Sequence, residues 1–86
     1  MGTRARARRS EKLSSGTKVL ILCGILMKAR RDGKPLCVAD MVRLMELKGI
    51  EVERRAIYRY IHAMEEYGYR FKRSYVGRRK YYMMQS

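Results

Sequence analysis

Apolar residues recur with the spacing of an amphipathic α-helix in three separate stretches of this chain. The stretches are residues 17–31, 38–48 and 53–67. In the last of them Ile57, Ile61 and Met64 stand at i, i+4 and i+7, so they share one face of a helix. Tyr60 lies beside them. Each stretch predicts a helix that turns an apolar face toward a common core.

Turn-forming residues separate these stretches. The run Asp32-Gly33-Lys34-Pro35 predicts the end of the first helix, Gly49 the end of the second and Gly68 the end of the third. At the other ends, we expect Thr17 to cap the first helix and Glu53 to cap the third. The second and third helices are thus joined by a short turn, as in a helix-turn-helix.

The C-terminal part of the chain changes to the two-residue period of a β-strand. Apolar and basic residues alternate over 69–73, a turn is predicted over 74–79, and a second strand over 80–84. Leu36 and Cys37 predict a short extended segment after the proline. The predicted fold is mainly α with a small β-hairpin: a winged helix-turn-helix with three helices and a wing sheet of two to three strands.

Residues 1–16 differ from the rest because they are basic and nearly free of large apolar side chains. Their arginines are Arg4, Arg6, Arg8 and Arg9. This composition predicts a disordered basic arm, followed by a winged helix-turn-helix domain over 17–86. The arm is either a solubilising tail or expression remnant, or a segment that follows a phosphate backbone or enters a minor groove. The alternation of arginine with alanine favours the second interpretation.

The charge of the chain indicates a polyanionic partner. Lysine and arginine number 21 against 8 acidic residues, which gives a net charge of +13. Such self-repulsion is relieved by nucleic acid, and the cations are spread over helix, hairpin and arm rather than along one membrane-binding helix. The longest apolar run, residues 19–27, is about half of what a bilayer span needs. We expect a cytoplasmic protein, in the nucleoid or in host cytoplasm if it is of phage or viral origin.

Residue types suited to catalysis or metal binding are sparse. Cys23 and Cys37 match no metal-ligand spacing and have only His62 as a possible third ligand. His62 precedes Glu66 by four residues, which predicts an exposed pair on a helix rather than a catalytic base. No glycine-rich phosphate loop is present. We therefore expect no enzymatic activity, no cofactor, no metal and no small-molecule ligand.

The helix predicted over 53–67 carries its cations on the face away from the core. Arg55, Arg59 and His62 fall on that face, and Arg54 and Tyr58 flank it near the N-terminus. Guanidinium groups reach both guanine edges and phosphates, so this helix is the predicted recognition helix. The predicted DNA-binding residues are Arg54, Arg55, Tyr58, Arg59, His62, Lys72, Arg78, Arg79 and Lys80, together with Arg4, Arg6, Arg8 and Arg9 of the arm.

The same helix carries a family resemblance. Over residues 52–61 and on to Gly68, the sequence resembles the winged helix-turn-helix domains of DeoR-type, WYL-type and biotin-repressor-type bacterial regulators. The matching residues are Arg54, Arg55, Ile57, Tyr58, Arg59, Ile61 and Gly68. The resemblance spans about residues 17–84 and implies that the start of this helix enters the major groove of DNA. It implies base or phosphate contacts from Arg54, Arg55 and Tyr58, and a backbone contact from Arg59.

Three positions depart from the pattern of these regulators. Glu53 stands where they usually have serine, Ala56 where they have threonine, and Tyr60 where they have aspartate. We expect the Ala56 methyl to be open to a thymine methyl, so the base preference of these regulators does not carry over. These regulators often append ligand-sensing domains, whereas this chain stops after the wing.

Ile21 and Ile25 do not lie on the apolar face of the first predicted helix. That face is formed by Val19, Leu22, Cys23 and Leu26. With Gly24 between them, Ile21 and Ile25 predict an exposed apolar patch. Either the arm or the C-terminal tail covers this patch, or it is the contact of a homodimer.

These features predict a double-stranded DNA-binding transcriptional regulator that acts as a homodimer. The alternative is an architectural protein that organises DNA or RNA without sequence preference, through the same basic surface. The tyrosines leave a single-strand mode open, because aromatic rings stack on unpaired bases; more often they fill the edge of a small core. The tyrosines concerned are Tyr69, Tyr75, Tyr81 and Tyr82.

Overall fold

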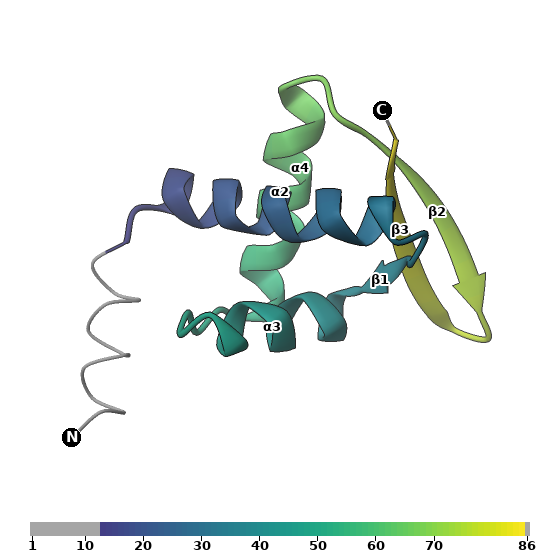
Figure 1. Cartoon of the computed structure of the whole chain (residues 1–86), viewed down its shortest axis with the longest axis horizontal. Helices are drawn as coiled ribbons and strands as arrows, with labels where there is room; N and C mark the ends of the chain where they lie inside the picture. Colours follow the sequence, from purple (N-terminus) through teal and green to yellow (C-terminus); the bar gives the residue numbers. More distant parts are fainter. Residues whose placement is uncertain (1–12, 86) are drawn as a thin grey trace.

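Three helices and a three-stranded antiparallel sheet form the fold of residues 13–85, the part of the chain that the computed structural model describes (Figure 1). In chain order the elements are α2 (Ser15–Arg31), β1 (Leu36–Cys37), α3 (Val38–Leu47), α4 (Arg54–Glu66), β2 (Arg70–Val76) and β3 (Arg79–Gln85). This is a winged-helix-like topology, and the predicted fold class is confirmed. The arginines predicted to form the arm, Arg4 to Arg9, lie outside the described residues. Within residues 13–85, no helix is long and apolar enough to cross a membrane.

Helix α2 begins earlier than the sequence predicts. Ser14 is its N-cap, and the Ser14 Oγ accepts a hydrogen bond from the Thr17 backbone N–H at 3.1 Å. The expected cap, Thr17, thus lies inside the first turn, where its Oγ1 is 2.9 Å from Ser14 Oγ. Because serine in extended backbone satisfies the first free N–H groups well, the helix includes Ser15 and Gly16, which the sequence predicts to belong to the arm.

Helix α2 also buries a wider face than the sequence predicts. It contacts α3, α4 and β3, and its buried residues are Leu22, Cys23, Ile25 and Leu26. Ile25 is only 8 % exposed and belongs to the core, and Ile21 is half-buried against it. The predicted exposed patch of Ile21 and Ile25 is therefore wrong. The exposed apolar side chain on this side of α2 is Leu20, at 73 %.

The connection between α3 and α4 is held by backbone geometry and one buried side chain. Gly49 adopts a φ of 81°, and the N–H of Ile50 donates to the Met45 carbonyl at 3.0 Å, which closes the end of α3. Ile50 is 3 % exposed and anchors the connection in the core. Glu53 is the N-cap of α4, but its carboxylate makes no capping hydrogen bond, contrary to expectation.

The sheet has the strand order β1-β3-β2, with β3 paired antiparallel to both neighbours. The register of β2 and β3 runs from Arg70↔Gln85 to Val76↔Arg79. The turn is therefore confined to Gly77 and Arg78, which is shorter than the predicted turn over 74–79. Gly77 has a φ of 64°, and glycine in the first position of a two-residue turn matches the twist of the strands. The hairpin consequently extends farther than the alternating pattern indicates.

Candidate nucleic-acid interface

Helix α4 separates an apolar inner face from a cationic outer face. The buried residues are Ala56, Ile57, Tyr60, Ile61 and Met64. The exposed residues include Arg54, Arg55, Tyr58, Arg59 and His62. The two faces predicted from the 3.6-residue period are confirmed. Burial of the inner face fixes the direction in which every outer side chain projects.

Ala56 belongs to the inner face, which corrects the expectation that its methyl is open to a thymine. Its side chain is 8 % exposed and lies in the core cluster. Successive helical residues are rotated by about 100°, so the Ala56 side chain turns away from the face that Arg55 presents. The Ala56 methyl contributes to packing rather than to a groove contact.

The wing, defined here as β2, β3 and their turn, presents one face toward α4. The Phe71 and Tyr82 rings meet edge to face, with centroids 6.2 Å apart. The Arg73 guanidinium and the Lys80 ammonium lie 5.3 Å and 5.7 Å from the centroid of the same Tyr82 ring. These four side chains share the inner face of the wing, because alternate residues of a strand point to one side.

Arg73 joins this inner face to α4. Its Nη2 donates to both carboxylate oxygens of Glu65, at 3.2 Å and 3.1 Å. The hydrogen bond to Glu65 raises the pKa of Arg73 above its ordinary value. Sequence reasoning missed this residue, because its partner is eight positions away across a helix end. Its role is to hold the wing against α4.

Lys72 lies on the other face of the wing. It stands between Phe71 and Arg73, which both point inward, and it pairs with Met83 across the hairpin. Its side chain is exposed, but it does not line the space between the wing and α4. A DNA contact by Lys72 stays a prediction and would involve the outer face of the wing.

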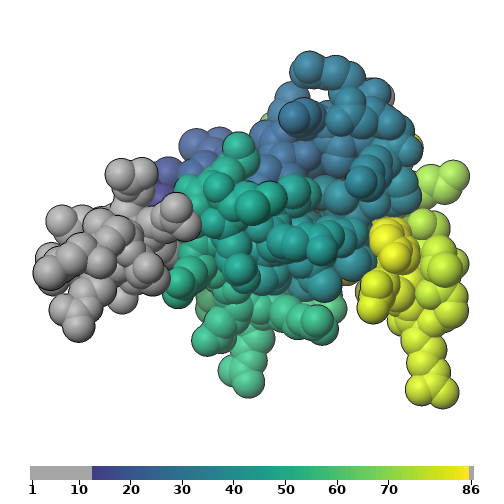
Figure 2. Space-filling view, turned by 60° about the horizontal axis from the view of Figure 1, so that its bottom comes forward, coloured from purple at the N-terminus to yellow at the C-terminus, as the bar shows by residue number. Residues whose placement is uncertain are grey.

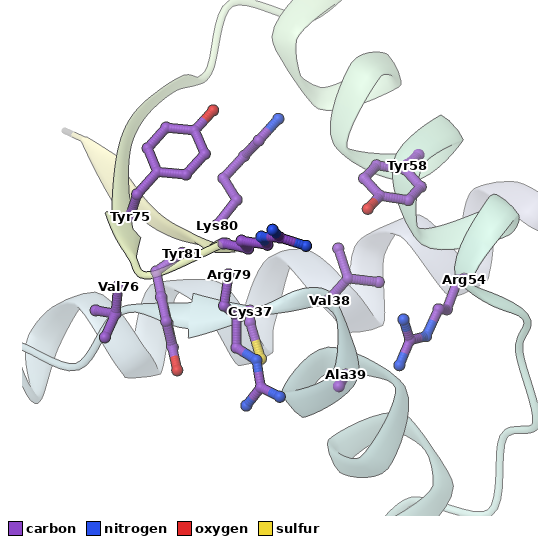
Figure 3. A pocket seen from close by; sticks show the side chains of 11 residues that line it. Cys37, Val38, Ala39, Arg54, Tyr58, Tyr75, Val76, Arg79, Lys80 and Tyr81 are labelled. Atoms are coloured by element: carbon purple, nitrogen blue, oxygen red, sulfur yellow. The ribbon is translucent and has the colours of Figure 1, made fainter.

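An open hollow of about 690 Å³ lies between α4, the wing and the start of α3. In Figure 2 the green side chains of α4 and the yellow side chains of the wing project from the same side of the molecule, with a gap between them. Figure 3 shows Arg54 and Tyr58 on the α4 wall, Tyr75 and Lys80 on the wing, and Val38 and Ala39 of α3 between the two. We call this space the basic hollow.

The basic hollow is lined by positive charge. Its four cationic side chains are Arg54, Arg78, Arg79 and Lys80, and no acidic residue is among the described residues that line it. The first residues of α3, Val38 and Ala39, also line it, and the Asp40 carboxylate in the same turn offsets the positive end of that helix dipole. Three predicted DNA-binding cations, Arg54 of α4 and Arg78 and Lys80 of the wing, thus meet at one surface. Arg79 lines the hollow from the face of β3 opposite to Lys80.

Three residues of α4 that are predicted to contact DNA lie outside the hollow. Arg55 is exposed on the outer face of the helix, and His62 Nε2 lies 3.1 Å from the Glu66 carboxylate, as the four-residue spacing predicts. Arg59 lines a different groove, between α4 and the first turn of α2. The cationic surface therefore continues from the hollow along the outer face of α4.

Two of the tyrosines named as candidates for base stacking, Tyr75 and Tyr81, line the hollow. Tyr75, Val76 and Tyr81 line it from the wing, and Tyr75 is paired with Lys80 in the register. The alternation signal identified the strands but not their pairing. Tyr69, another candidate for stacking, instead faces α2, where a hydrogen bond with the Cys23 thiol raises the pKa of its phenol.

The cysteines form no metal centre in the described part of the chain. Cys23 and Cys37 are buried free thiols, and residues 13–85 contain no cluster of three or more potential metal ligands. Cys37 precedes α3 at the edge of the basic hollow, where its backbone N–H donates to Asp40 at 3.3 Å. The chemistry available in the hollow is therefore cationic and aromatic.

Comparison with known proteins gives no closer assignment. The chain matches no protein-family model, no curated protein and no solved structure. The likeness to winged helix-turn-helix proteins therefore rests on the order of the elements and on the residues of α4.

Proposed function

We propose that this protein binds double-stranded DNA and regulates transcription. One observation carries the proposal: Arg54 of α4 and Arg78, Arg79 and Lys80 of the wing line one hollow that no acidic residue enters among the residues described. Cations from separate elements that converge on one surface match the repeated phosphates of a duplex better than a scattered solvated charge does.

In the proposed complex, the N-terminal part of α4 enters the major groove. Arg55 and Tyr58 project from its exposed face, where a guanidinium reads guanine O6 and N7 through paired hydrogen bonds. Arg59 and His62 extend the contact along the backbone. The wing cations neutralise flanking phosphates, and the N-terminal arm follows the backbone or a minor groove. Regulation would occur by occupancy in the cytoplasm, without a cofactor or a small-molecule ligand.

Binding-site selection from a random duplex pool tests the proposal. A regulator should enrich a defined sequence and bind it at physiological salt at least about a thousandfold more tightly than a scrambled duplex of equal length. Equal affinity for both duplexes would contradict regulation by sequence and favour the alternative, an architectural protein that binds nucleic acid through the same cations. Absence of measurable binding to either duplex would contradict both.

Arg55 provides a sharper test of base reading. Replacing Arg55 with alanine should cost roughly 1–3 kcal/mol on the selected site and relax preference at one position. Lys48→Ala is the matched control, because Lys48 is also exposed but lies at the end of α3 and outside the hollow. A small and equal loss of affinity on every sequence would make Arg55 a phosphate contact.

The homodimer remains a proposal with a revised surface. Because Ile25 is buried, the exposed apolar side chains near the predicted patch are Leu20 of α2 and Leu47 of α3, at 73 % and 78 % exposure. Sedimentation of the protein and of a Leu20→Glu variant tests the idea. A dimer that survives Leu20→Glu does not use this side of α2, and a monomeric parent protein would contradict the homodimer altogether.

A further inference from the structure

Two tyrosines stand on opposite walls of the basic hollow: Tyr58 on α4 and Tyr75 on the wing (Figure 3). From this arrangement, and resting on the proposed function, we infer that the hollow receives an unpaired DNA base. The preferred ligand is then a duplex with adjoining single-stranded DNA, rather than a continuous duplex.

The exposure of these two rings is the first step of the argument. Tyr58 is 53 % exposed and Tyr75 is 64 % exposed, whereas Tyr60 on α4 and Tyr82 on β3 are buried at 6 % and 3 %. Within residues 13–85, no hydrogen bond engages the hydroxyl of Tyr58 or Tyr75. The fold therefore uses the buried pair for packing and leaves the faces of the exposed pair free.

Stacking chemistry is the second step. A ring face binds a nucleobase face, and in an intact duplex those faces are covered by neighbouring base pairs. An exposed tyrosine can then touch only base edges or backbone. A base that is free of the stack offers its whole face, and stacking of this kind tolerates every base sequence.

The size and charge of the hollow fit such a base. Its volume of about 690 Å³ lies within the usual range of about 300–1,000 Å³ for small-ligand sites. Lys80 lies between the two tyrosines in Figure 3, and Arg54 lies below Tyr58 on the same wall. Cations beside aromatic faces are the combination by which proteins hold single strands, with the backbone on the charge and the base on the ring.

The experiment compares a blunt DNA duplex with the same duplex carrying a short single-stranded overhang. The first unpaired base of the overhang is 2-aminopurine, whose fluorescence is quenched when an aromatic ring stacks on it. The proteins are the parent chain, Tyr75→Ala, Tyr58→Ala and Tyr75→Phe. Tyr67→Ala is the control, because Tyr67 is 87 % exposed at the end of α4 and does not line the hollow.

We expect the parent protein to prefer the overhang and to quench the probe. Tyr75→Ala should weaken overhang binding by roughly 5- to 150-fold, the equivalent of about 1–3 kcal/mol, with little change on the blunt duplex. Tyr58→Ala should also lose the preference. Tyr75→Phe keeps the ring and should retain both preference and quenching, as should Tyr67→Ala.

Other outcomes separate this inference from the function on which it rests. Equal binding of blunt and overhang DNA without quenching overturns the unpaired-base site and leaves duplex binding intact. If Tyr75→Phe loses as much affinity as Tyr75→Ala on both DNAs, the hydroxyl contacts phosphate and the stacking role is wrong. Failure of the parent protein to bind either DNA contradicts the proposed function itself.

Discussion

The two walls of the basic hollow are built by different physical means. Helix α4 buries five of its thirteen residues in the core, so its position follows from close packing. Strand β2 buries none of its seven residues, and only Phe71 is half-buried. Strand β2 therefore takes its position from pairing with β3, from the aromatic contact of Phe71 with Tyr82, and from the Arg73–Glu65 ion pair.

This difference matters because the proposed ligand touches both walls. A helix with a packed inner face holds its outer cations at fixed spacing. Strand β2 and its turn are mostly exposed and have fewer buried contacts to resist local opening, although β3 buries Tyr82 and Met84. The α4 wall is accordingly the fixed part of the site and the wing the adjustable part, so substitutions in the two should affect stability and binding in different proportions.

The largest effect should come from the core of α4. Ile57 is 0 % exposed, and Ile57→Ala removes buried carbon and leaves a cavity, which should lower the free energy of unfolding by about 2–5 kcal/mol. Urea denaturation followed by circular dichroism measures this change. Tyr67→Ala, at the exposed C-cap of the same helix, should change stability by less than about 0.5 kcal/mol. Equal effects at the two positions would contradict the packed-wall description of α4.

A smaller effect should come from the turn of the wing. Gly77 has a φ of 64° and open space where a side chain would stand, so Gly77→Ala should lose about 1–2 kcal/mol through backbone strain alone. Gly24→Ala is the control, because the expected change in stability has the opposite sign. Gly24 lies within α2 and also has open space beside its Cα, so Gly24→Ala should stabilise the protein by about 0.5–1 kcal/mol. The same denaturation experiment measures both variants, and a Gly77→Ala protein as stable as the parent would argue against the tight turn.

The smallest effect on stability should come from the ion pair between the wing and α4. Arg73 and Glu65 are 38 % and 33 % exposed, so solvent screens their attraction. A double-mutant cycle with Arg73→Met and Glu65→Gln should give a coupling energy of about 0.2–1 kcal/mol. The coupling should fall further at high salt. A coupling energy near zero at low salt would mean that the wing is positioned by strand pairing and aromatic contacts alone.

Periodicity predicted the helices and the two faces of α4, because each depends on neighbours in the same element. Ile57, Ile61 and Met64 are buried as expected, while Arg55 and Tyr58 are exposed. What the sequence did not predict depends on other elements. Ile25 is buried because α2 contacts three other elements, α3, α4 and β3, and the number of these contacts is not visible in the pattern of α2 itself.

The candidate site shows the same limit. Its cations were predicted from charge and position, and the predicted fold brings helix and hairpin to one side, but the face of the hairpin that each cation occupies was not predicted. Lys72 and Lys80 look equivalent in the sequence, yet the hairpin register places Lys80 on the inner face and Lys72 on the outer one. The role of Arg73 likewise required its partner Glu65 to be known.

The most direct measurement compares two variants that have the same net charge but lose cations at different positions on the surface. In one variant the cations of the hollow, Arg54, Arg78, Arg79 and Lys80, are replaced with glutamine. In a second variant, the exposed cations Lys28, Arg31, Lys34 and Lys48, which do not line the hollow, are replaced in the same way. Each variant loses the same net charge.

Duplex affinity is then measured from about 50 to 200 mM salt for the parent protein and both variants. If the hollow contacts phosphates, the slope of log affinity against log salt should lose about 0.9 for each contact removed in the first variant, and should stay close to the parent value in the second. Equal losses of slope in the two variants would show that net charge alone drives binding, and would contradict the assignment of the basic hollow as the DNA interface.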